Sequence, residues 1–93
     1  MNHEQWIVGS HRSVDRLING KRVAICEVYS GAADSLEQAD KFQHLIAAAP
    51  DMLIELQLLV ATMVMIFGPE KAKHLTVGAR DAIAKATKQG PKT

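Results

Sequence analysis

The sequence is poor in the residues from which disulfide frameworks and aromatic cores are built. Its 93 residues include one cysteine, Cys26, and aromatic side chains make up 4%. A lone cysteine cannot form an internal disulfide, which is typical of proteins from a reducing compartment such as the cytosol. Because aromatic residues are so few, a core has to be built from Leu, Ile, Val, Met and Ala.

The sequence also lacks the pattern of a targeting or membrane-spanning segment. No basic stretch followed by an apolar one opens the chain, so no secretory signal is predicted. The longest apolar run, residues 52–67, contains Glu55, Gln57 and Thr62, and it is shorter than the roughly 20 apolar residues that cross a bilayer. We therefore expect a cytoplasmic protein that does not use a membrane.

Length and charge restrict the remaining classes. A chain of 93 residues has room for one domain, residues 1–93, and its net charge of +1 excludes a strongly polyionic protein. The charge is unevenly distributed, since residues 31–67 are acidic and residues 68–93 are basic. These segments can neutralise each other within one chain or between two copies, or the basic end can bind an anionic partner.

The first 30 residues have the pattern of three short antiparallel strands. Residues 5–8 form a β-prone run, and two further runs flank Asn19-Gly20, which favours a type I′ hairpin turn because both central positions of that turn need positive φ. The turn opposes Ile18 to Lys21 and Val14 to Ile25, and it places on one face Val14, Ile18, Val23 and Ile25. The third strand is apolar on both faces, so we expect it to be the central strand or to meet another chain.

The middle of the chain has the periodicity of helices. Ser35 and Gln38 fit a capping box at the start of a helix over residues 35–49. Its predicted apolar face consists of Leu36, Ala39, Phe42, Ile46 and Ala49. Pro50 either starts a new helix or kinks a continuous one, and we favour two helices, 35–49 and 50–67, because proline disfavours helical geometry in the residue before it.

The end of the chain is also predicted to be helical. Gly68-Pro69 ends the apolar helix. A short helix over 69–75 and a last helix over 76–89, capped by Thr76, then precede a tail at 90–93. The predicted fold class is therefore α+β, with a three-stranded antiparallel sheet followed by three or four helices.

The helix over 50–67 is apolar nearly all round, which requires burial nearly all round. A chain of this size has little with which to cover it, although a helix wrapped wholly by its own chain is the alternative. We therefore predict a homo-oligomer, most simply a symmetric dimer. The predicted self-association interface comprises Leu58, Leu59, Met63, Met65, Ile66 and Phe67.

Catalytic and metal-binding patterns are not found in the sequence. Cys26 has no nearby histidine at a spacing typical of a thiol enzyme, and the four histidines show no paired ligand spacing. We predict no catalytic residue, no metal and no cofactor. Residues that could contact an anionic partner are Lys71, Lys73, Arg80, Lys85 and Lys88.

One segment resembles a known group of proteins. Residues 45–53 read Leu-Ile-Ala-Ala-Ala-Pro-Asp-Met-Leu and match the pattern L-I-A-A-A-P-[DE]-x-L. This segment, the tryptophan-led first strand, the run ending at Tyr29 and the closing residues 82–86 resemble small uncharacterised bacteriophage and prophage proteins. The resemblance implies a phage origin and a setting inside the host cell, and it implies no known activity.

These observations lead to one functional hypothesis and one alternative. The hypothesis is a non-enzymatic interaction protein of phage type that self-associates through its apolar helix and binds or modulates another protein, of the host or of the phage. The alternative is a nucleic-acid-associated protein that uses the basic C-terminal region.

Overall fold

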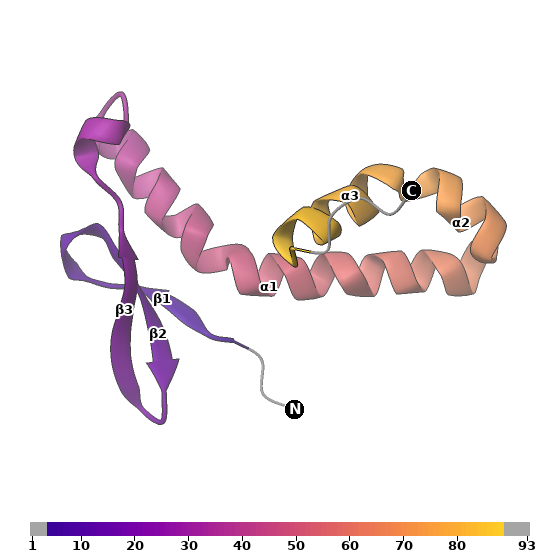
Figure 1. The fold of residues 1–93 in the computed structure, drawn as a ribbon, viewed down its shortest axis with the longest axis horizontal. Coiled ribbons are helices and arrows are strands. Elements are labelled where there is room, and N and C mark those ends of the chain that lie inside the picture. Colours follow the sequence, from indigo (N-terminus) through magenta and orange to yellow (C-terminus); the bar gives the residue numbers. More distant parts are fainter. Residues whose placement is uncertain (1–3, 89–93) are drawn as a thin grey trace. The chain divides into compact units, whose positions relative to one another are not determined.

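The computed structural model describes residues 4–88 and has an α+β architecture (Figure 1). A three-stranded antiparallel sheet of order β1-β2-β3 is followed by helices. The elements are β1 (Trp6–Val8), β2 (Ser13–Ile18), β3 (Lys21–Glu27), α1 (Leu36–Phe67), α2 (Pro69–Leu75) and α3 (Val77–Ala86), with short 3-10 turns at Ser10–Arg12 and Ser30–Ala32. The predicted fold class is confirmed, and the predicted tail at 90–93 lies outside the described residues.

The chain divides into two compact units, Met1–Asp51 and Met52–Thr93, where the sequence predicted one domain. The division falls beside Pro50, within α1, at the junction where the sequence favoured a break between two helices. α1 nevertheless continues through Pro50 as one helix, so the prediction of separate helices over 35–49 and 50–67 is wrong. Proline removes one N–H donor, and a long helix tolerates that loss as a local defect.

The hairpin of the first unit forms at the predicted turn. Asn19 and Gly20 have φ of 49° and 80°, as a type I′ turn requires, and Ile18 pairs with Lys21. The register shifts between Val14 and Asp15, so Val14 pairs with Cys26 and not with Ile25. A β-bulge therefore places one extra residue of β3 in the ladder, and the predicted common apolar face of Val14, Ile18, Val23 and Ile25 is interrupted.

β2 is the central strand of the sheet, and β3 lies at its edge. The prediction that the third strand is central is wrong, because the short first strand pairs with β2. All seven residues of β3 are exposed, while Val14 and Asp15 of β2 are buried. No other described strand pairs with the outer edge of β3, the strand that is apolar on both faces.

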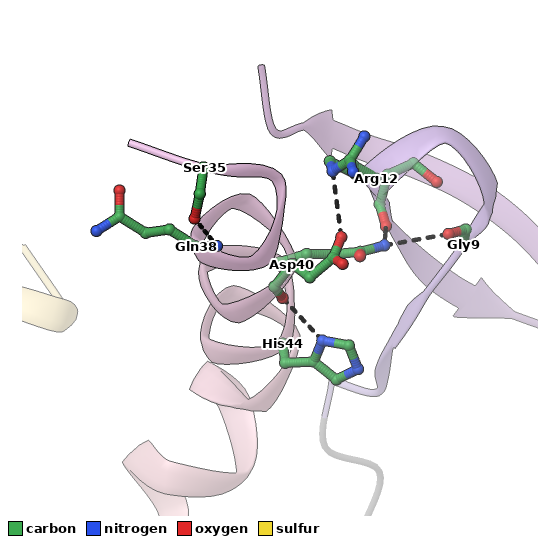
Figure 2. Close-up of polar contacts among 8 residues, drawn as sticks. Gly9, Arg12, Ser35, Gln38, Asp40 and His44 are labelled. Atoms are coloured by element: carbon green, nitrogen blue, oxygen red, sulfur yellow. Dashed lines mark hydrogen bonds and ion pairs between the residues drawn. The ribbon is translucent and has the colours of Figure 1, made fainter. Parts of the chain in front are cut away.

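Polar contacts join the sheet to the first half of α1. The side-chain amide of Gln43 is buried, and it donates hydrogen bonds to the carbonyl oxygens of Gly9 (3.1 Å) and Ser13 (2.8 Å). Arg12 forms an ion pair with Asp40 at 3.1 Å (Figure 2). Ala39 and Gln43 are therefore the buried residues of this helical segment, whereas Leu36, which was predicted on the inner face, is 62% exposed.

The predicted capping box opens α1. The Gln38 backbone N–H donates to the Ser35 hydroxyl at 3.0 Å (Figure 2). In return the Gln38 side chain accepts a hydrogen bond from the Asp34 backbone N–H, one residue before the usual position. These two bonds satisfy backbone donors that the start of a helix leaves free.

The helices of the second unit follow the predicted boundary at Gly68-Pro69, but α3 ends at Ala86 and not at the predicted residue 89. Gly68, with φ of 81°, ends α1, and Pro69 begins α2 at a position where proline has no helical bond to lose. Thr76 precedes α3, but its hydroxyl donates back to the carbonyl of Ala72 at 2.7 Å and does not cap α3. Within this unit Ala72 and Thr76 are the buried residues among those described, and larger apolar side chains such as Val60, Met63 and Ile83 are half-buried.

Candidate functional site

The most exposed apolar surface of the second unit lies on α1. Five of the six side chains predicted for self-association are exposed, and Met63 is half-buried. Met65 exposes 85% of its surface and Ile66 66%, values more usual for charged residues than for large apolar ones. We call this surface the α1 apolar face, defined by Leu58, Leu59, Met65, Ile66 and Phe67.

The α1 apolar face continues along one side of the helix with the spacing of a helix–helix seam. Met52, Leu59 and Ile66 are exposed and seven residues apart, and Leu58 and Met65 flank them. Thr62 lies between them, and its hydroxyl donates to the carbonyl of Leu58 at 2.8 Å. Because that hydroxyl is satisfied within the helix, covering this seam leaves no threonine donor unpaired.

α1 is also long and apolar enough by length and composition to cross a membrane, and none of its most apolar window is buried. The acidic residues Asp51 and Glu55 interrupt that window. The stretch without a charged residue, 56–67, rises about 18 Å as a helix, whereas the hydrocarbon core of a bilayer is about 30 Å thick. The uncharged part of α1 is therefore shorter than the hydrocarbon core.

A second apolar surface is a groove within the first unit, beside the end of β3. It encloses about 410 Å³ and is lined by Cys26, Glu27, Val28, Tyr29, Ala32, Phe42, Leu45 and Ile46. Tyr29 is 73% exposed and Leu45 59%, so the groove is open to solvent. Its lining offers apolar contact with little polar chemistry, and the Cys26 thiol is exposed and free.

The predicted basic contacts are spread over α2, α3 and the residues after α3. The Lys71 ammonium lies over the Phe67 ring, 5.8 Å from its centroid. Arg80 donates to the Thr76 hydroxyl at 3.2 Å and to the Lys73 carbonyl at 2.8 Å. Two of the five predicted cations thus already have contacts within the chain, while Lys85 is in the last turn of α3 and Lys88 follows that helix.

Within residues 4–88, no cluster of three or more His, Cys, Asp or Glu side chains could hold a metal ion. The Nδ1 atom of His44 contacts the carbonyl of Asp40, 2.8 Å away on the same helix (Figure 2). In the first unit, the Arg16 guanidinium donates two hydrogen bonds to the Glu4 carboxylate and lowers the pKa of Glu4. The hydrogen bond from the Trp6 indole N–H lowers the same pKa to a smaller extent. Glu4 is exposed, which is typical of a surface ion pair.

Sequence reasoning missed the buried amide of Gln43 and the glycine that it contacts. A Cβ added to Gly9 would collide with the side chains of Ser13 and Asp15, so a larger residue at this position requires these side chains to shift. The sequence contains no local signal for this packing, because Gly9 and Gln43 lie 34 residues apart.

These features define a small α+β protein with two uncovered apolar surfaces. A family model matches residues 1–91, nearly the whole chain, and its description is Salmonella phage P22 protein Y8K6. The chain belongs to this phage protein family. No curated protein and no solved structure matches the chain.

Proposed function

We propose that this phage protein is a non-enzymatic interaction protein that self-associates through the α1 apolar face and binds another protein. The observation that carries the proposal is the exposure of Leu58, Leu59, Met65 and Ile66 on one helix. A second copy is the occupant that supplies an identical apolar helix, and symmetric dimers are the commonest closed assembly.

The size of the side chains left exposed supports the same proposal. Burying a Leu or Ile side chain contributes about 1.5–3 kcal/mol. Covering Leu58, Leu59, Met65 and Ile66 with a second copy would therefore remove a large apolar area from water.

The test of self-association is the mass of the native protein, measured by light scattering after size exclusion. We expect the wild type to be at least a dimer and Ile66→Glu to have a lower mass, because the substitution places a charge on the α1 apolar face. Gln57→Glu is the matched control, since Gln57 is exposed on the opposite side of the same helix and should leave the mass unchanged. A monomeric wild type contradicts the proposal.

Binding of another protein, of the host or of the phage, is tested by affinity capture with the same pair of variants. A partner that uses the α1 apolar face or depends on the dimer is lost with Ile66→Glu and kept with Gln57→Glu. A partner retained by both binds elsewhere, for which the groove beside β3 is the first place to look.

The alternative is a nucleic-acid-associated protein that uses the basic C-terminal region. Phosphate contacts by Lys71, Lys73, Arg80, Lys85 and Lys88 would make binding fall steeply as salt rises. A shift of DNA or RNA at low salt that is lost when these residues are replaced by Gln would favour this alternative. No shift at low salt would end it.

A further inference from the structure

The outer edge of β3 is a second surface that is built for pairing. β3 is the longest strand, it lies at the edge of the sheet, and each of its seven residues is exposed. In a two-residue hairpin the pair next to the turn is hydrogen-bonded, and bonding alternates along the strands. Lys21 and Val23 are therefore bonded to β2, while the N–H and C=O groups of Arg22 and Ala24 point to the free edge.

The order of residues in β3 determines which strand can complete this edge. The strand reads Lys-Arg-Val-Ala-Ile-Cys-Glu, with two basic residues at one end and an acidic one at the other. Two copies aligned antiparallel about Ala24 bring Lys21 and Arg22 of one copy to the level of Glu27 of the other. The same alignment sets Val23 opposite Ile25, and β-branched and opposite-charge pairs both favour sheet formation.

Other alignments lose this complementarity. A parallel pair would place the basic ends together, and like charges directly opposite each other are unfavourable. The β-bulge adds one residue between Ala24 and Cys26, so Glu27 lies opposite Arg22 if the bulge is counted and opposite Lys21 if it is not. Charge complementarity therefore holds in both cases.

Charged ends and bulges are also the means by which proteins protect edge strands from pairing. In β3, however, the charges lie only at the ends, and the four residues between them are Val23, Ala24, Ile25 and Cys26. A protected edge carries a charge within its apolar run, where it would oppose any incoming strand. The pattern of β3 therefore favours pairing with an antiparallel strand that carries the same charged residues at its ends.

We propose that two copies of this chain pair through β3, antiparallel and centred on Ala24, to form one continuous six-stranded sheet. This surface is distinct from the α1 apolar face, and the proposal shares with the proposed function only that the partner is a second copy. It also explains why the strand that is apolar on both faces lies at the edge of the sheet.

The test is site-directed crosslinking of the full chain. In a Cys26→Ser background, Ala24→Cys places two thiols directly opposite each other, where Cβ atoms lie about 4.5–5.5 Å apart. A short bismaleimide should then give a covalent dimer. Tyr29→Cys in the same background is the control, because it is exposed but lies far from the centre of the pair. A yield at Ala24→Cys no higher than at Tyr29→Cys overturns the proposal.

Charge exchange tests the alignment. Added to Ala24→Cys, Glu27→Lys should lower the crosslinking yield about tenfold, because both symmetric contacts become repulsive. A chain with Lys21→Glu and Arg22→Glu should be impaired similarly. An equimolar mixture of these two chains should regain the wild-type yield as mixed dimers, which a folding defect in either chain would not allow. No recovery in the mixture overturns the antiparallel alignment.

The two interfaces have separate readouts. A crosslink at Ala24→Cys that survives Ile66→Glu supports pairing through β3, whatever the light-scattering mass of Ile66→Glu alone. If Ile66→Glu lowers the mass as expected but no crosslink forms at Ala24→Cys, the α1 contact stands and the β3 pairing is wrong.

Discussion

Each of the two units of this chain contains a different kind of polar contact. In the unit up to Asp51, polar groups of distant segments are joined, such as Gln43 with Gly9 by a hydrogen bond and Arg12 with Asp40 by an ion pair. In the unit from Met52 onward, the side-chain bonds described above are local, such as Thr76 with Ala72 and Thr62 with Leu58. Among residues 4–88, the long-range side-chain contacts described above lie in the first unit.

The apolar residues differ less between the two units. The fully buried Val14 lies in the first unit, but both units expose large apolar side chains, such as Ile25 and Leu45 in the first and Met65 and Ile66 in the second. Apolar area is stabilising only when it is removed from water. Each unit therefore keeps apolar surface that a partner can cover, whereas the long-range polar contacts described above belong to the first unit.

The largest effect within the first unit is expected for Gly9→Ala. A Cβ there collides with the Ser13 and Asp15 side chains, which are themselves hydrogen-bonded at 2.9 Å. We expect the free energy of unfolding to fall by about 2–3 kcal/mol, as for other overpacked sites. Chemical denaturation measures it, with Gly31→Ala as the control because no atom lies within 4 Å of its added Cβ. Equal stability of the two variants would show that this junction is not tightly packed.

A smaller loss is expected for Gln43→Ala. The substitution removes both side-chain donors and leaves the Gly9 carbonyl without the bond from α1, while the Ser13 carbonyl keeps the bond from the Gly9 N–H at 2.9 Å. We expect a loss of about 1–2 kcal/mol, the range for a buried polar group that loses its partner. Lys41→Ala, on the exposed side of the same helix, should change stability far less. If Gln43→Ala matched it, the first unit would not depend on this long-range contact.

Local signals in the sequence predicted the hairpin turn and the end of α1, whereas the last helix ends at Ala86, before the predicted residue 89. Asn19-Gly20 sets the turn, and Gly68-Pro69 ends α1, because each acts on the backbone of its own residues. The β-bulge, the edge position of β3 and the burial of Gln43 depend on segments that meet only in the fold. Pro50 misled the prediction because its local preference for a break was overridden by the rest of a long helix.

The candidate surfaces, too, could be predicted only in part from the sequence. The excess of apolar residues in 50–67 was visible in the sequence, and the structure places five of the six named side chains on the surface. The face that they form could not be predicted in full, because packing against other elements selected which side of α1 is covered. The groove beside β3 was not predicted, since it joins residues from a strand, a turn and a helix.

The stability of the second unit should rise when helix propensity is increased at a position where the new side chain meets no other atom. Gly78 lies in the first turn of α3, and a Cβ added there meets no atom within 4 Å. Gly78→Ala should therefore stabilise the protein by about 0.5 kcal/mol through the lower backbone entropy of the unfolded chain. Thermal unfolding measures this gain. A loss of stability would mean that a partner covers this position.

The smallest effect is expected at the surface ion pair of the first unit, and it depends on pH. Arg16 lowers the pKa of Glu4 in the folded protein, so the pair stabilises the fold above the ordinary pKa of a glutamate, and this contribution is lost as pH falls through the lowered value. Glu4→Gln should thus be slightly less stable than wild type at pH 7 and equal to it in strong acid. Trp6, the single tryptophan, donates to the Glu4 carboxylate at 3.2 Å, so its fluorescence reports the titration directly. An emission change that persists in Glu4→Gln would assign the transition to another group.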